Sequence, residues 1–232
     1  MPSRFAALAG RTIVVTRPAA QAAGLARALK RQGARVLCLP TIRIAAPTSY
    51  GALDKAIRTL GSYDCLVFTS QNAVELFFAR ADFLGFRSLK RPKLFAIGPK
   101  TAAALRRHGW RAAAVPEKSR GEALARAITG VRGARVLIPR ARKAREELAL
   151  ILRRRGARVD IVEAYRTVED RRGAARLRRL ADADAIDAVT FTSASTVFSF
   201  ARQLGAARWR KLLKRATAAS IGPITAVEGF RK

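Results

Sequence analysis

The stretch Asp64-Cys65-Leu66-Val67-Phe68-Thr69-Ser70-Gln71-Asn72-Ala73-Val74 decides the expected fold, because it returns later in the chain as residues 187–197 (DAVTFTSASTV). Each copy is an apolar run of strand type, followed by a hydroxyl-rich turn and the start of an apolar helix face. Ser70, Gln71 or Asn72 can cap the first of these helices. Thr69 maps on Thr192, which is a shift of 123 residues. The pattern predicts a buried strand that runs directly into a helix, twice in one chain.

Other blocks of the chain repeat at nearly the same distance. Residues 13–17 (IVVTR) map on residues 136–140 (VLIPR) at a shift of 123, and residues 97–102 (IGPKTA) map on residues 221–226 (IGPITA) at 124. Separate blocks that share nearly one offset predict two similar halves. Strands and helices alternate through both halves, which favours an α/β fold with parallel sheets flanked by helices.

Local signals add more specific expectations. Gly33 is placed as the cap that ends a helix over 19–32. Ser119 and Glu122 fit a capping box that opens another helix. The alternation also predicts a short strand over 112–115, a basic loop over 85–92, and helices over 143–155 and 171–183.

The net charge of +30, from 46 Lys and Arg against 16 Asp and Glu, is the strongest compositional signal. Such a field attracts polyanions, whether nucleic acid, an acidic membrane or a polycarboxylate substrate. The cations are spread over many helices, so for most of them a solvated arginine-rich surface is the alternative. No apolar run reaches the roughly 18 residues of a membrane span, and the N-terminal residues lack a signal-peptide core. A cytoplasmic protein is expected.

The sequence offers few residues for a reactive thiol, a metal site, a histidine-based triad or a nucleotide-binding loop. Cys38 and Cys65 both fall in predicted buried strands and read as reduced core thiols. His108 is the only histidine and lies near a predicted helix end, so a metal site or a histidine-based triad has almost no ligands to draw on. Residues 98–101 (GPKT) lack the spacing of a phosphate loop, and no G-x-G-x-x-G follows a strand.

What remains is a set of small hydroxyl residues at predicted helix N-termini, where backbone N–H groups can hold carboxylates. These residues are Thr69, Ser70, Thr101, Ser193, Ser195 and Thr225. Plain helix capping is the alternative for each of them. Most of them follow the carboxyl ends of predicted strands, which is where parallel sheets bind ligands. An enzyme built this way would orient a reactive substrate more than attack it.

Six short motifs, in this order along the chain, together resemble the uroporphyrinogen-III synthase family. They are residues 15–18 (VTRP), 68–74 (FTSQNAV), 97–102 (IGPKTA), 164–167 (AYRT), 191–193 (FTS) and 221–226 (IGPITA). The resemblance implies a cofactor-free lyase that closes the linear tetrapyrrole hydroxymethylbilane, inverts its last pyrrole ring and releases water. It also implies a monomer whose partner is this small polycarboxylate substrate, with no specific nucleic acid and no membrane.

The resemblance further implies two domains with the substrate in a cleft between them. Residues 1–40 plus 169–232 would form the first domain, and residues 47–164 the second. Residues 41–46 and 165–168 would be extended connectors. The first half continues through a strand and a helix over 112–129 that have no counterpart after Thr225. We therefore expect an open sheet edge, exposed apolar side chains and marginal stability in the first domain.

The resemblance assigns Tyr165 to assisting departure of the substrate hydroxyl; the alternative is a packed connector aromatic. The implied substrate-binding residues are Arg17, Thr69, Ser70, Gln71, Asn72, Gly98, Thr101, Arg140, Ser193, Ser195, Gly222 and Thr225. No metal is implied. The rival interpretation, from the charge, is a non-catalytic two-domain protein that binds polyanions.

Overall fold

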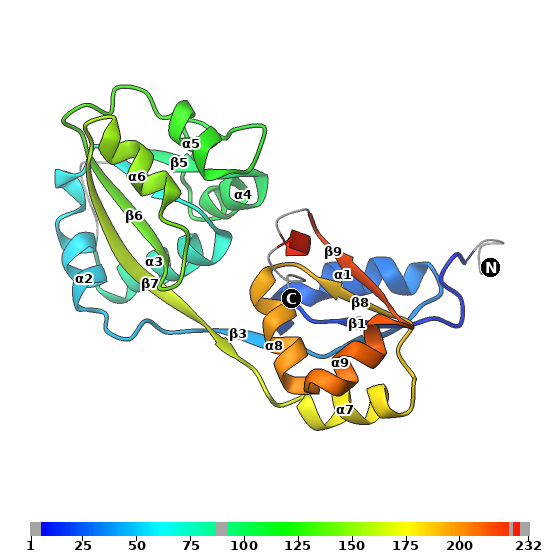
Figure 1. Ribbon diagram of the computed structural model, residues 1–232. Coiled ribbons are helices and arrows are strands. Elements are labelled where there is room, and N and C mark those ends of the chain that lie inside the picture. The colour runs from blue at the N-terminus through cyan, green and yellow to red at the C-terminus, as the bar shows by residue number, and fades with distance from the viewer. Residues whose placement is uncertain (1–5, 87–91, 223–224, 228–232) are drawn as a thin grey trace. The chain divides into compact units, whose positions relative to one another are not determined.

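The chain forms two compact units in a computed structural model, which describes residues 6–86, 92–222 and 225–227. Unit 1 comprises Met1–Arg43 with Val168–Lys232, and unit 2 comprises Ile44–Thr167. Each unit holds a parallel sheet with helices packed on it (Figure 1). The predicted α/β class, with parallel sheets flanked by helices, is confirmed. No helix in the described part of the chain is long and apolar enough to cross a membrane.

The sheet of unit 1 has the strand order β2-β1-β8-β9. Its strands are β1 (Thr12–Val15), β2 (Arg35–Cys38), β8 (Ala188–Phe191) and β9 (Thr217–Ser220). Its helices are α1 (Ala19–Arg31), α7 (Ala174–Asp182), α8 (Ala194–Leu204) and α9 (Ala206–Leu213). Helices α7, α8 and α9 contact one another and share a buried core with Val14, Val189 and Phe191, whereas α1 packs on β1 and β2.

The sheet of unit 2 has the strand order β3-β7-β6-β4-β5. Its strands are β3 (Ile42–Ala45), β4 (Cys65–Phe68), β5 (Lys93–Ala96), β6 (Arg135–Ala141) and β7 (Arg158–Glu169). Its helices are α2 (Gly51–Arg58), the short 3-10 turn η1 (Leu60–Ser62), α3 (Gln71–Phe83), α4 (Pro99–Arg107), α5 (Gly121–Ala127) and α6 (Glu147–Arg154).

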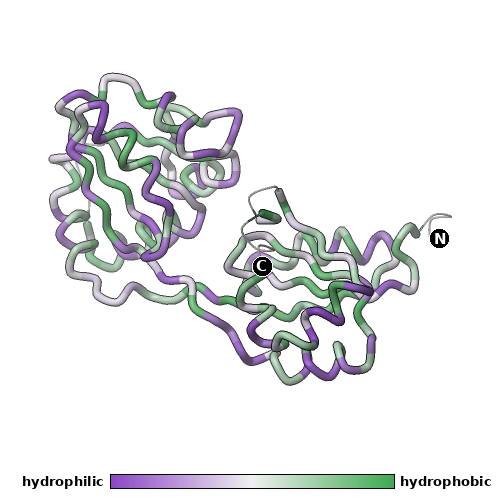
Figure 2. The backbone as a smooth tube through the Cα atoms, viewed as in Figure 1, coloured by the Kyte–Doolittle hydropathy of each residue, from purple (hydrophilic) through white to green (hydrophobic). Residues whose placement is uncertain are grey.

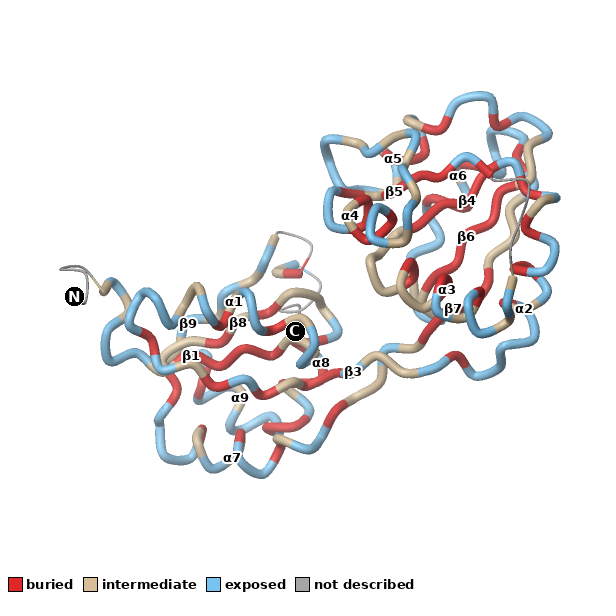
Figure 3. The backbone as a smooth tube through the Cα atoms, turned by 180° about the vertical axis from the view of Figure 1, so that it is seen from behind, coloured by how far each residue is buried: buried red, intermediate tan, exposed pale blue. Residues whose placement is uncertain are grey.

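The strand β4 shows why this sheet is buried on both faces. Leu66 and Phe68 belong to one core with α2, α3 and α4, while Cys65 and Val67 belong to a second core with α5 and α6. Successive side chains of a strand point to opposite faces, so a central parallel strand must be apolar at every position. Figure 2 shows hydrophobic residues along the central strands, and Figure 3 shows the same strands buried.

The two halves of the sequence repeat in strand order and in register. Strands β2-β1-β8-β9 of unit 1 correspond to β7-β6-β4-β5 of unit 2. Ile13 pairs with Ala188, and its counterpart Val136 pairs with Cys65. The aspartate that opens each copy of the repeated stretch makes the same bond: Thr12 N donates to Asp187 Oδ2 at 2.8 Å, and Arg135 N donates to Asp64 Oδ2 at 2.8 Å.

Two helices begin several residues later than expected, and hydrogen bonds made by arginine side chains explain both delays. The helix expected over 143–155 begins only at Glu147, since the Arg140 guanidinium takes the carbonyl oxygens of Ala144 and Arg145. The helix expected over 171–183 begins at Ala174, after two arginines that pair with the acids at the end of β7 and just beyond it. By contrast, Gly33 follows the C-cap residue Gln32 of α1 with a φ of +85°, as a glycine that ends a helix should.

Other local expectations also need correction. The strand expected over 112–115 is reduced to one bridge between Phe95 and Ala114. The capping box at Ser119 was wrong, because α5 begins at Gly121 after Arg120 and has no side-chain cap. Cys38 is exposed, at the end of the edge strand β2, whereas Cys65 is buried on the central strand β4. The basic loop over 85–92 lies mostly outside the described residues.

Candidate active site

The expected site residues of unit 2 lie at the carboxyl ends of its strands. Residues 69–72 follow β4, Gly98 follows β5, and Arg140 stands near the end of β6. Tyr165 lies opposite Ala141 in the register of β6 and β7, so it reaches the same edge of the sheet. Parallel strands put their carboxyl ends at one edge, which explains how residues so distant in sequence come together.

Tyr165 and Ser70 form the central contact of this edge. The Tyr165 hydroxyl lies 3.0 Å from the Ser70 hydroxyl, and either oxygen can be the donor. Ser70 is the N-cap of α3 and accepts a hydrogen bond of 3.1 Å from the Ala73 N–H. Tyr165 is only 7% exposed, and its backbone carbonyl accepts from Arg142 N at 3.1 Å. Ser70 therefore holds the phenol, and the Arg142 N–H holds the backbone of the same residue.

The N-terminus of α4 is open where that of α3 is capped. Its N-cap is Gly98, so no side chain satisfies the first N–H groups of the helix. A Cβ at this position would clash with the Ser119 hydroxyl. Thr101, in the first turn, is 4% exposed, and its hydroxyl, which makes no hydrogen bond to a described residue, is not sealed from solvent. Unpaired N–H groups and the hydroxyl of a buried threonine at a helix N-terminus suit a carboxylate.

Arg140 is almost fully buried and already engaged. Its Nη1 donates to the carbonyl oxygens of Ala144 and Arg145, at 3.2 and 2.7 Å, and its Nη2 lies 3.3 Å from Glu146 Oε1. In this state the guanidinium organises the loop between β6 and α6. A substrate acid would compete there with Glu146, whose contact is the longest of the three.

The expected site residues of unit 1 lie at the carboxyl edge of its own sheet. Ser193 caps α8 by accepting from Thr196 N, and the Ser193 and Ser195 hydroxyls are 2.9 Å apart. Thr225 is 6% exposed, and Ala226 N donates to Gly222 O as Ala102 N donates to Gly98 O. The repeat thus builds two similar edges.

Arg17, just after β1, has an N–H donor that is available to a ligand. Its Nη2 donates to Gln21 Oε1 at 3.2 Å. Its Nε is buried and has no hydrogen-bond partner among the described atoms. A buried N–H without an acceptor costs free energy, so this atom suits a bound carboxylate.

The structure therefore sorts the expected residues into two groups. Unit 2 holds Thr69, Ser70, Gln71, Asn72, Gly98, Thr101, Arg140 and Tyr165, and unit 1 holds Arg17, Ser193, Ser195, Gly222 and Thr225. Sequence reasoning missed that Ser119 packs against Gly98, because no local pattern announces a contact between separate loops. Within the described residues, no three His, Cys, Asp or Glu side chains gather where they could hold a metal ion.

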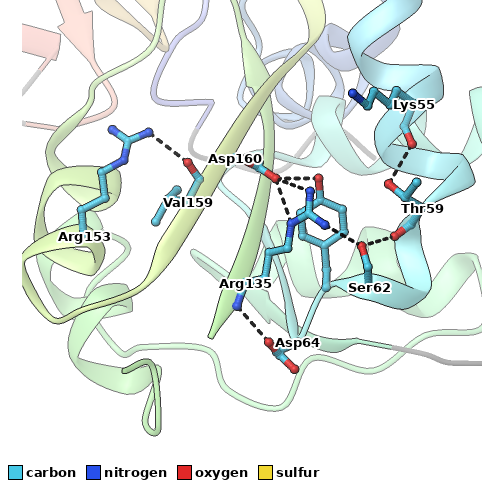
Figure 4. Close-up of polar contacts among 9 residues, drawn as sticks. Lys55, Thr59, Ser62, Asp64, Arg135, Arg153, Val159 and Asp160 are labelled. Atoms are coloured by element: carbon cyan, nitrogen blue, oxygen red, sulfur yellow. Dashed lines mark hydrogen bonds and ion pairs between the residues drawn. The ribbon is translucent and has the colours of Figure 1, made fainter. Parts of the chain in front are cut away.

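A second phenol, with a raised pKa, lies outside this group. Burial, and then the hydrogen bond to Asp160, raise the pKa of Tyr63 to about 12. Tyr63 precedes β4 and donates to Asp160 Oδ2 at 2.8 Å, and the Arg135 guanidinium lies over its ring. Arg135 also bonds Ser62 and Asp64 there (Figure 4). This cluster links the amino ends of the strands, so we assign it a structural role and no part in the reaction.

Comparison with known proteins identifies relatives over nearly the whole chain. A family model described as uroporphyrinogen-III synthase HemD matches residues 23–228. A putative uroporphyrinogen-III synthase of Methanothermobacter thermautotrophicus is 35% identical over 219 residues, covering 92% of this chain and 86% of that protein. A uroporphyrinogen-III synthase of Synechococcus elongatus is 32% identical over 232 residues, covering 95% and 86%.

Solved structures agree with the fold. A mutant uroporphyrinogen III synthase from the extremely thermophilic bacterium Thermus thermophilus gives a TM-score of 0.69 at 21% identity, covering 94% of this chain and 88% of that chain. The uroporphyrinogen-III synthetase of Helicobacter pylori 26695 gives 0.51 at 17% identity, covering 94% and 97%. At these identities the structural likeness speaks for the fold alone.

Proposed function

Since the chain belongs to the uroporphyrinogen-III synthase family, we propose that it closes hydroxymethylbilane to uroporphyrinogen III, inverting the last pyrrole ring and releasing water. The contact between Tyr165 and Ser70 at an edge rich in open N–H groups is the observation that supports this most directly. An electron-rich pyrrole loses its hydroxyl easily, and unguided closure gives the wrong isomer. The main task of the protein is then to hold geometry.

Tyr165 is the proposed catalytic residue. Its phenol donates a proton or a hydrogen bond to the leaving hydroxyl, while the pyrrole supplies the electron pair that replaces the breaking C–O bond. The hydroxyl departs as water. Inversion of the last ring breaks one of its C–C bonds to a methylene bridge and forms another at the ring carbon that carried a hydrogen. The proton released from that carbon returns to the phenolate, so the reaction balances without a cofactor. A buried tyrosine whose hydroxyl meets only Ser70 among the described residues suits this role.

The carboxylates of the substrate are proposed to bind the open N–H groups and hydroxyls at both sheet edges. Thr101 and Thr225 are buried residues in matching positions of the repeat, and Arg17 adds a buried N–H donor. The backbone and side chains of Thr69, Gln71, Asn72, Gly98, Ser193, Ser195 and Gly222 complete the proposed set. Arg140 joins it if a carboxylate displaces the Glu146 contact.

The finer expectations are part of the same proposal. We place the reaction in the cytoplasm and assign it to a monomer, with no specific nucleic acid or membrane partner. We also propose that the functional domains are residues 1–40 with 169–232 and residues 47–164, joined by connectors at 41–46 and 165–168.

The test supplies hydroxymethylbilane made enzymatically in the assay and measures the ratio of type III to type I product. Type III should dominate. The variant Tyr50→Phe serves as a control, because this tyrosine is exposed and stands at the N-cap position of α2 without a side-chain capping bond. Type I product alone, together with tight and salt-sensitive binding to duplex DNA, would favour the polyanion-binding rival instead.

A further inference from the structure

The Ser70 hydroxyl has two neighbours that decide how it can act. It accepts the Ala73 N–H at 3.1 Å, which fixes the oxygen at the N-terminus of α3. It also lies 3.0 Å from the Tyr165 hydroxyl. Its partners among the described residues include no carbonyl or carboxylate oxygen, so the phenol oxygen is the acceptor within reach of the serine proton.

The pair has two hydrogen-bonding arrangements with different consequences. If Tyr165 donates to Ser70, the phenol proton points away from any substrate. If Ser70 donates to Tyr165, the phenol proton is free for the leaving group. The Ala73 N–H already fills one acceptor position on the serine oxygen and polarises its O–H, which favours the second arrangement.

We propose that Ser70 is a positioning residue for Tyr165, and not a ligand of the substrate. Its hydroxyl donates a hydrogen bond to the phenol oxygen and so directs the phenol proton toward the substrate. Because Ser70 also caps α3, this hydrogen bond brings the positive potential of the helix N-terminus to the phenol oxygen as that oxygen becomes negative. This inference rests on the proposed role of Tyr165.

The repeat supplies an internal comparison. Ser193 caps α8 as Ser70 caps α3, but its hydroxyl meets Ser195, and the position that corresponds to Tyr165 is Ile42. Capping a helix in this fold therefore does not require a phenol. The contact with Tyr165 is particular to unit 2 and calls for its own explanation.

The kinetic test is a double-mutant cycle with Ser70→Ala and Tyr165→Phe. Ser70→Ala should lower kcat about tenfold with little change in KM, and Ser70→Thr, which keeps a hydroxyl, should recover most of the loss. In the Tyr165→Phe background, Ser70→Ala should lower kcat no further. A raised KM with unchanged kcat, or losses that multiply, would overturn the proposal and make Ser70 a substrate ligand or a cap alone.

A spectroscopic test needs no activity. The chain has three tyrosines, so protein labelled at the tyrosine ring carbon that bears the hydroxyl gives resonances that single Tyr→Phe variants can assign. Ser70→Ala should move the Tyr165 resonance and leave those of Tyr50 and Tyr63 in place. Ser193→Ala, which removes a matching cap, should move none of them.

The two tests separate the two levels of inference. An unmoved Tyr165 resonance in a folded Ser70→Ala protein contradicts the positioning role, whatever the enzyme does. A moved resonance in a protein that forms no type III product keeps the contact but contradicts the proposed function. Thermal melting of each variant shows whether loss of the α3 cap has unfolded the protein.

Discussion

At the scale of single residues, the site contains several hydroxyl groups that differ in whether they already make hydrogen bonds. The hydroxyl oxygens of Ser70 and Ser193 accept the hydrogen bonds that cap two helices. The hydroxyl of Thr101, a buried residue, makes no hydrogen bond in the described part of the chain. A sequence cannot separate these cases, because each is a small hydroxyl residue at or near the start of a helix that follows a strand. The distinction depends on contacts between strands and helices that are far apart in the chain.

Tyr165→Phe should lower kcat by about a hundredfold and leave the choice of type III product largely intact. General acids usually supply about two to four powers of ten, and a hydroxyl that leaves easily needs the lower end. Isomer choice depends on how the whole substrate is held, which the phenol does not decide. Steady-state rates with separation of the two isomers check this. An unchanged rate would return Tyr165 to a packing role.

Thr101→Val should weaken substrate binding without costing stability. The side chain keeps its shape, and no described hydrogen bond is lost, since the hydroxyl has no partner there. A hydrogen bond to a carboxylate contributes about 1.5–3 kcal/mol, so KM should rise at least tenfold. Thermal melting and KM are measured together.

Thr16→Val is the matched control for this substitution. Thr16 is also fully buried, but its hydroxyl donates to Thr190 O at 2.7 Å. This variant should lose about 1 kcal/mol of unfolding free energy. Equal melting losses in the two variants would mean that the Thr101 hydroxyl has a structural partner after all.

At the scale of elements, apolar runs predicted the strands well and side-chain interference explains the misses. The central strand β4 was expected from its apolar run and covers that run, Cys65–Phe68. The start of α6 was not predictable, because Arg140 is part of β6 and takes carbonyl oxygens that a helix would otherwise use. The first strand–helix unit of the repeat also predicted its second copy, since the same register and the same aspartate recur.

Asp187→Asn tests the aspartate at the start of the repeated stretch. The Thr12 N–H, and then the Arg11 guanidinium, hold the pKa of Asp187 below its usual range. A depressed pKa contributes stability that is present above the ordinary value near 3.8 and is lost as pH falls. The variant should be less stable at pH 7 by about 0.5–1 kcal/mol, because this carboxylate is partly exposed.

The difference between the two proteins should shrink as the carboxylate of the wild type is protonated. Urea unfolding at pH 7, 5, 4 and 3 gives the free energy of each protein. The curves should converge toward the acid end of this series. A constant difference at every pH would assign the loss to shape and not to charge.

At the scale of the whole molecule, each unit is assembled from both halves of the sequence. Unit 1 takes β1 and β2 from the first half and β8 and β9 from the second, and unit 2 takes β4 and β5 from the first and β6 and β7 from the second. The offset of 123 residues predicted the duplication, whereas the expected division of the strands between two domains came from the family resemblance. The repeat by itself is equally consistent with each half of the sequence forming its own domain.

The net charge of +30 also belongs to the whole molecule, and its expected effect is on substrate capture. A polycarboxylate is drawn to a field of this sign, and salt shortens the field from about 10 Å at 0.1 M to about 3 Å at 1 M. KM should therefore rise severalfold between low and moderate ionic strength, while kcat and the ratio of type III to type I product stay nearly constant. Rates measured across a series of sodium chloride concentrations at one pH test this. A flat KM would mean that the cations do not act on the substrate, and that the short-range contacts at the two sheet edges alone determine its binding.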